Sequence, residues 1–374
     1  MKKLVGLRRI RNVNIAKKRD CYRAFRKYHK GNFHTLTTLT PPAILSFSKN
    51  PKETLEFLQT FRSYVLKKNV LSNRRGKSYV HGPRFVVDFT AIREISIPFS
   101  VVLAAEFQRA QILRNTRLTL QKIKHWQPRV RQIFAELGIF DLLKIKKSEK
   151  IIHKFESDPV DNISTTKLVS GLRADGKQID ELQSNFQNDI KFFTKRPILF
   201  DGLSEAVENA MAHAYPDDFK SVHPFAGHRW WGVSCLDLTT DTLRFFVFDQ
   251  GAGIPFTLPK QGFSEELRAL IGEFAPGFGV SDSKMLRAAL EIGRTRTGES
   301  NRGLGLHRMS EVVTASPESY LRILSGHGDI VYAADKVQSE RNYSLPLGGT
   351  LIEWSIPVDI FGVPTDEAQN VANN

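Results

Sequence analysis

The stretch Leu243-Arg-Phe-Phe-Val-Phe-Asp249-Gln-Gly251-Ala-Gly253-Ile-Pro255 joins an almost wholly apolar run to a short turn of Asp and Gly. Such a run is typical of a strand in the centre of a sheet. At the strand end, the Asp249 carboxylate can accept a hydrogen bond from an exocyclic amine, and Gly251 and Gly253 let the backbone approach a flat base closely. An ordinary turn after a strand has the same composition. Only the neighbouring motifs can therefore distinguish a turn that binds a base from an ordinary turn.

Upstream, residues 203–215 predict a helix with one polar and one apolar stripe. Glu205, Asn209 and His213 stand four residues apart on the polar stripe. Asn209 can supply a hard oxygen ligand to Mg²⁺, and Glu205 one turn away can act as a base for water. The alternative is a solvated polar face on an amphipathic helix.

Downstream, two glycine motifs follow a long connection over residues 256–302. Arg302-Gly303-Leu-Gly305 leads into a predicted helix, whose free N–H groups and positive dipole end suit phosphates. Arg302 can add positive charge there. Gly348-Gly349-Thr350 enters the last predicted strand and, taken alone, predicts only a turn.

In this order and spacing, the four motifs resemble the ATP-binding domain of the GHKL superfamily, which includes gyrase, Hsp90, histidine kinases and the mismatch-repair ATPases. The resemblance covers residues 195–357 and implies an α/β sandwich that binds ATP and Mg²⁺. It further implies Glu205 as general base, Asn209 as the Mg²⁺ ligand, Asp249 as the adenine reader, Gly251 and Gly253 beside the base, Arg302, Gly303 and Gly305 around the phosphates at a movable lid, and Thr350 behind the adenine.

Length and composition predict a two-domain globular protein. The chain has 374 residues, of which 41% are hydrophobic and 25% charged. Cys21 and Cys235 lie far apart, so neither a disulfide framework nor a CxxC metal or redox site is indicated. The sequence has no apolar run long enough for a membrane span, and we expect a cytoplasmic protein. We divide the chain into a basic arm (1–35), an α/β domain (36–155), the ATP-binding domain (156–360) and a polar tail (361–374).

The N-terminal α/β domain contains a shorter resemblance. The strand and turn at Val86–Ile92, followed by a helix, resemble STAS domains, which are partners of anti-sigma serine kinases. The phosphorylated residue of that family would fall near Ile97 or Pro98, so the phosphorylation switch is absent here. A generic strand-to-helix turn is the alternative. After this domain, residues 165–193 predict a helix.

Residues 1–30 hold twelve Lys or Arg and one acidic residue, within a formal net charge of +15 for the chain. Tyr22, Phe25 and Tyr28 are interleaved with the basic residues, as in segments that bind nucleic acid. A solvated arm, or one docked on an acidic face of the same protein, is the alternative. The basic residues that we single out as nucleic-acid contacts are Arg8, Arg9, Arg11, Lys17, Lys18 and Arg19.

We expect a Mg²⁺-dependent ATPase that acts as a nucleotide-controlled conformational switch and works with a protein partner or as a homo-oligomer. Two alternatives remain open. One is a protein serine/threonine kinase of the anti-sigma type. The other is a non-catalytic ATP-sensing scaffold that recruits protein or nucleic acid.

Overall fold

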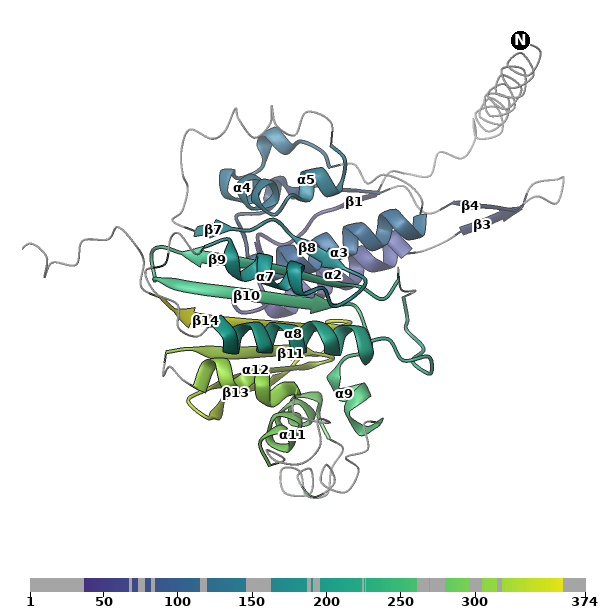
Figure 1. The fold of residues 1–374 in the computed structure, drawn as a ribbon. Helices are drawn as coiled ribbons and strands as arrows, with labels where there is room; N and C mark the ends of the chain where they lie inside the picture. The colour runs from purple at the N-terminus through teal and green to yellow at the C-terminus, as the bar shows by residue number, and fades with distance from the viewer. Residues whose placement is uncertain are drawn as a thin grey trace, which may run out of the picture.

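The computed structural model describes most of the chain between residues 37 and 358 (Figure 1). The described residues are 37–66, 69–72, 78–81, 85–114, 120–145, 163–186, 190, 196–223, 225, 227–260, 269, 280–295, 305–314 and 318–358. The predicted basic arm with its candidate nucleic-acid contacts, the polar tail, Arg302 and Gly303 all lie outside them.

An eight-stranded antiparallel sheet forms the centre of the fold, so the chain is a mixed α/β protein. The strand order is β13-β12-β11-β14-β10-β9-β7, and β8 also pairs with β9. β10 is paired along its whole length with β9 and β14, which confirms the predicted central strand. The strands are β7 (Ile163–Thr165), β8 (Val169–Gly171), β9 (Trp230–Asp237), β10 (Thr242–Asp249), β11 (Tyr320–Ser325), β12 (Gly328–Ala333), β13 (Lys336–Asn342) and β14 (Thr350–Pro357).

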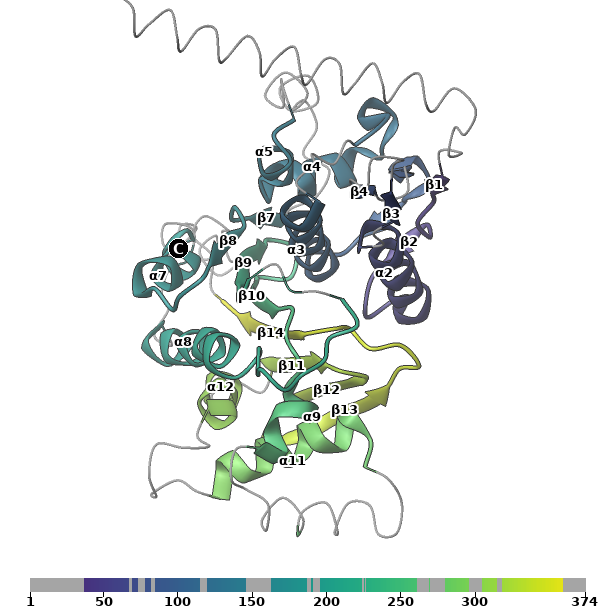
Figure 2. The same cartoon turned by 90° about the vertical axis from the view of Figure 1, so that its right-hand side faces the viewer.

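A helical layer covers one face of the sheet (Figure 2). Because successive side chains of a strand point to opposite faces, Leu243, Phe245 and Val247 of β10 all pack into this layer. The short helix α9 (Ile254–Thr257) follows β10 directly. The helices of the layer are α7 (Gly176–Ser184), α8 (Arg196–Ala212), α11 (Asp282–Thr295) and α12 (Gly305–Thr314).

The N-terminal half forms a second layer on the opposite face of the sheet (Figure 2). Phe246 and Phe248 of β10 share one hydrophobic core with its helices, chiefly α3. Two short parallel pairs, β1 with β5 and β2 with β6, and the hairpin β3-β4 complete the layer. Its elements are β1 (Thr37–Leu39), β2 (Ile44–Leu45), α2 (Pro51–Leu66), β3 (Asn69–Ser72), β4 (Ser78–His81), β5 (Phe85–Val87), β6 (Glu94–Ile95), α3 (Ile97–Arg114), α4 (Pro128–Glu136) and α5 (Ile139–Leu142).

The predicted helix over residues 165–193 is wrong at its beginning. Val169–Gly171 forms β8, because this segment finds a partner in β9. The helix begins only at Gly176, where the Asp175 side chain accepts a hydrogen bond from the Lys177 amide at 2.9 Å.

The predicted domain boundary between residues 155 and 156 lies outside the described residues. None of the helices in the described part of the chain is long and apolar enough to cross a membrane.

Candidate functional site

The candidate site lies at one end of the sheet, where β10 ends, β14 begins and β11 ends. The antiparallel register pairs Asp249 with Thr350, and Thr350 in turn with Ser325 at the end of β11. The hydroxyl oxygens of Ser325 and Thr350 are 2.9 Å apart. The structure therefore brings together Asp249 and Thr350, which are about a hundred residues apart in the sequence.

Asp249 is buried, and its carboxylate accepts hydrogen bonds from two residues, Gly251 and Thr350. Its Oδ1 accepts the backbone N–H of Gly251 at 2.7 Å, and Thr350 also hydrogen-bonds to it. Burial raises the pKa of Asp249 to about 7, although these hydrogen bonds lower it. A buried carboxyl group that titrates near neutrality is more frequent at functional sites than elsewhere.

The two glycines after Asp249 occupy positions that a larger residue would not fit. A Cβ on Gly251 would lie 2.1 Å from the carbonyl oxygen of Ala214, just after α8. The amide of Ala252 donates to the same oxygen at 2.7 Å. Gly253 has φ +85°, and a Cβ there would lie 2.9 Å from the Ser325 hydroxyl. The turn after β10 is thereby held against the C-terminal end of α8.

Glu205 and Asn209 lie together on α8, as their spacing predicted. The Asn209 amide nitrogen donates to Glu205 Oε1 at 3.2 Å, and Arg308 of α12 lies 3.5 Å from Glu205 Oε2. Burial raises the pKa of Glu205, while the charge of Arg308 opposes this shift. The side chain of Glu205 is 17% exposed, so a water molecule can reach it. Nothing in the sequence singled out Arg308.

Gly305 begins α12, which packs beside α8. The two helices are so close that a Cβ on Gly202 would lie 3.0 Å from Val312. Arg308, in the first turn of α12, forms the ion pair with Glu205 described above. The beginning of α12 therefore adjoins the polar stripe of α8, whereas the rest of the predicted glycine loop lies outside the described residues.

A buried charge cluster lies directly behind the turn that holds Asp249. Glu106 of α3 is 1% exposed and accepts hydrogen bonds from Arg62 at 2.8 and 3.0 Å, from Arg109 at 3.0 Å, and from the Gln250 amide at 3.0 Å. Burial alone would raise the pKa of Glu106, but the two guanidinium groups lower it to about 2. Arg62 also donates to the Leu347 carbonyl oxygen at 2.6 Å. The N-terminal layer thus contacts the segments before Thr350 and after Asp249.

The sequence-based prediction missed this cluster, although one feature of the sequence indicates it. Glu106 interrupts an otherwise apolar stretch of α3, and a lone acid in such a stretch needs a buried partner. The partner, Arg62, belongs to α2 and is recognisable only when the two helices are placed side by side. Among the described residues, no group of three or more His, Cys, Asp or Glu side chains is arranged to hold a metal ion.

Comparison with known proteins adds no relative. No protein-family model matches the chain, and no curated protein matches its sequence.

Proposed function

We propose that this chain is a magnesium-dependent ATP-binding protein of the GHKL type, whose ATPase activity operates a conformational switch. One observation supports this more than any other. Asp249 and Thr350 are paired at the end of the sheet. Gly251, in the turn that follows Asp249, packs against Ala214 just after α8. Helix α8 carries Glu205 and Asn209, so the residues expected at the base and at the phosphates belong to adjoining elements.

In this proposal, Asp249 accepts a hydrogen bond from the exocyclic amine of adenine. A carboxylate offers about four acceptor positions, so one remains after the Gly251 amide and the amide and hydroxyl of Thr350 are bound. The bonds from Gly251 and Thr350 fix the orientation of the carboxylate before the base arrives. Gly251 and Gly253 lie beside the base, and Thr350 lies behind it.

The residues at the phosphate side fit a magnesium nucleotide. Mg²⁺ takes oxygen ligands and is held by one or two protein groups together with phosphate oxygens and waters. Because the Asn209 nitrogen donates to Glu205, its amide oxygen is left for the metal. When bound, Mg²⁺ would neutralise phosphate charge. Arg302, Gly303 and Gly305 would bind the phosphates themselves.

Glu205 serves as the general base in this proposal. Its raised pKa brings its basicity closer to that needed to take a proton from water at neutral pH. The ion pair with Arg308 holds Oε2, and the bond from Asn209 holds Oε1, so the carboxylate is oriented without being fully enclosed. The same group suits a kinase, in which a hydroxyl replaces the water.

The buried cluster around Glu106 supports a switch rather than a simple hydrolase. Gln250 follows the adenine-reading Asp249 directly, and its side chain is hydrogen-bonded to α3. Arg62 of α2 binds the carbonyl oxygen of Leu347, shortly before Thr350. A movement of either nucleotide-contacting segment therefore changes a contact with the N-terminal layer.

The experiment that tests this function follows γ-labelled ATP with the full-length chain and Mg²⁺. We expect label released as inorganic phosphate. Label transferred to another protein would favour the anti-sigma type of kinase, and binding without turnover would favour a scaffold. Failure to bind ATP at all would contradict all three.

The proposal extends to the setting in which the switch works. The basic arm would contact nucleic acid, and a protein partner or a second copy would read the nucleotide state. We place this work in the cytoplasm. The STAS-like character of the N-terminal layer would suit a regulatory partner that has become part of the same chain.

A further inference from the structure

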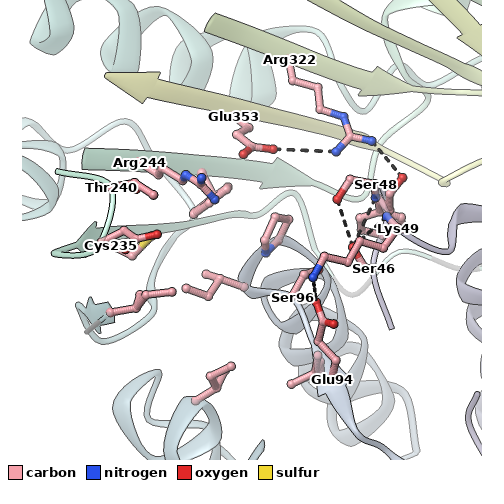
Figure 3. A pocket seen from close by; sticks show the side chains of 18 of the residues that line it. Ser46, Ser48, Lys49, Glu94, Ser96, Cys235, Thr240, Arg244, Arg322 and Glu353 are labelled. Atoms are coloured by element: carbon pink, nitrogen blue, oxygen red, sulfur yellow. Dashed lines mark hydrogen bonds and ion pairs between the residues drawn. The ribbon is translucent and has the colours of Figure 1, made fainter. Parts of the chain in front are cut away.

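A cavity of about 640 Å³ lies between the N-terminal layer and the sheet (Figure 3). It faces the sheet side opposite to α8 and adjoins Arg244 near the beginning of β10. Asp249 is five residues further along this strand, roughly 17 Å at 3.4 Å per residue. The cavity is therefore separate from the proposed nucleotide site, and its volume is in the range of pockets that bind small molecules.

The walls of the cavity are amphipathic. Phe47 and Ile97 from the N-terminal layer and Phe246 from the sheet provide apolar surface. Charged groups come from both layers, including Lys49, Arg244 and Arg322. A ligand with an apolar body and a charged group would contact both layers at once.

Two of these cations are already paired within the protein. Lys49 forms an ion pair with Glu94 at 2.6 Å. Arg322 binds Asp329 through two hydrogen bonds of 2.8 Å and donates to the Phe47 carbonyl oxygen at 3.0 Å. Arg322 therefore has little capacity left for a ligand, and the Lys49 ammonium, whose side chain is 63% exposed, lies at the solvated edge of the cavity.

The acidic groups of the cavity are occupied as well. Glu353 accepts a hydrogen bond from the Tyr320 hydroxyl at 2.8 Å and lies 3.9 Å from Arg322. Asp237 accepts the Thr239 amide at 3.0 Å. Each of these two carboxylates therefore already has at least one partner within the protein.

Arg244 differs from these groups. Its side chain is half-buried in the wall, and its buried Nε atom has no hydrogen-bond partner among the described residues. The carboxylates of Glu353 and Asp237 lie near enough to raise the pKa of Arg244, but neither accepts a hydrogen bond from it. Figure 3 shows it between Glu353 and Cys235, with no interaction drawn to it. A buried guanidinium donor without an acceptor is costly, and a carboxylate is the acceptor whose geometry matches it.

We propose that this cavity binds a small monocarboxylate with an apolar body, whose carboxylate accepts hydrogen bonds from Arg244. The acids in and around the wall balance its cations, so a monoanion fits better than a doubly charged phosphate ester. Because the lining comes from both layers, the ligand joins the N-terminal layer to the sheet. This site is independent of ATP binding.

The test is isothermal titration calorimetry of the full-length protein, without nucleotide, against five carboxylates at millimolar concentration: acetate, isovalerate, benzoate, indole-3-acetate and 4-phenylbutyrate. Each is paired with its neutral amide, and phenyl phosphate serves as the doubly charged probe. We expect at least one of the larger carboxylates to bind, and its amide and phenyl phosphate to bind at least about 10-fold more weakly. Equal binding of acid and amide, tighter binding of phenyl phosphate, or no binding of any carboxylate would overturn the proposal.

Two variants assign the binding to Arg244. Arg244→Met should lower the affinity for the carboxylate by about 10-fold or more, because a charge-assisted hydrogen bond is lost. Arg173→Met replaces an exposed arginine outside the cavity and should leave the affinity unchanged. Unchanged affinity in a folded Arg244→Met protein would contradict the assignment. If that variant does not fold, the comparison of acid with amide on the wild-type protein still decides.

Discussion

The side-chain amide of Gln250 donates a hydrogen bond to Glu106 at 3.0 Å, across a sequence separation of 144 residues. Gln250 belongs to the turn after β10, and Glu106 belongs to a helix of the N-terminal layer. Both side chains are buried. This bond joins the residue next to Asp249 to a charge cluster that also holds the segment before Thr350.

Replacing Gln250 should weaken the contact between the turn after β10 and the N-terminal layer. Gln250→Met keeps the volume of the side chain and removes the donor, and hydrogen bonds to charged groups contribute about 1.5 to 3 kcal/mol. We expect a loss of this size in the free energy of unfolding, measured by urea denaturation. We also expect ATP to slow amide exchange in α3 less than it does in the wild type.

The matched control is Gln338→Met, which removes an exposed amide that donates to the Ala333 carbonyl oxygen. It should change the free energy of unfolding by less than about 0.5 kcal/mol. A Gln250→Met protein with wild-type stability and a wild-type exchange response would show that the contact with Glu106 does not couple the two layers.

Asp249 should make the protein less stable as the pH rises. Its pKa is raised from 3.8 in the unfolded chain to about 7 in the fold, so the folded state holds this proton more tightly. Stability is therefore lost between about pH 4 and pH 7, by up to about 4 kcal/mol. Asp249→Asn should exceed the wild type in unfolding free energy at pH 8 and match it near pH 4. A pH-independent difference would contradict the burial of an ionisable group.

The sequence predicted the parts of the fold whose pattern is local. β10 is apolar from Phe245 to Phe248 and lies at the centre of the sheet, and α8 carries Glu205 and Asn209 side by side. Both predictions depended only on spacing along one element. The pairing of Asp249 with Thr350 was not predicted by any single pattern, and only the resemblance carried by the four motifs together implied that the two residues lie close to each other.

Other features depend on partners distant in the sequence. In β14, Glu353 and Ser355 alternate with apolar residues, a pattern typical of a strand with one solvent-facing side, but the N-terminal layer covers that side and both residues are buried. β13 is polar because it is an exposed edge strand, and it therefore gave no apolar signal. The cation that pairs with Glu205, Arg308, comes from another helix.

The Glu205→Ala variant should still bind ATP but should hydrolyse it much more slowly. The loss of a general base lowers the rate of a chemical step by about 10²-fold or more. We expect this in single-turnover hydrolysis, with an ATP affinity within a few-fold of the wild type. Glu181→Ala, an exposed acid on α7, is the control and should turn over normally. Wild-type rates for Glu205→Ala would leave Glu205 as part of a solvated polar face.

The basic arm should bind nucleic acid through phosphates. Binding of labelled single- and double-stranded DNA and RNA should be largely independent of sequence and should weaken with salt, with a log-log slope of about −0.7 to −0.9 per phosphate neutralised. Deleting residues 1–30 should flatten this slope and leave ATP affinity unchanged. No binding at low salt, or an identical slope after the deletion, would eliminate the arm as a nucleic-acid contact.

The most direct measurement is calorimetric titration of the full-length protein with ATP, with and without Mg²⁺, repeated with Asp249→Asn. We expect Mg²⁺-dependent binding to the wild type. In the variant, binding should be weaker by about 1 to 3 kcal/mol, because an amide matches the adenine amine poorly. The variant should be folded and at least as stable as the wild type at pH 8, so a loss of affinity cannot be attributed to unfolding. No ATP binding to the wild type would contradict the proposed function, and equal affinity in the variant would contradict the role of Asp249 as the adenine reader.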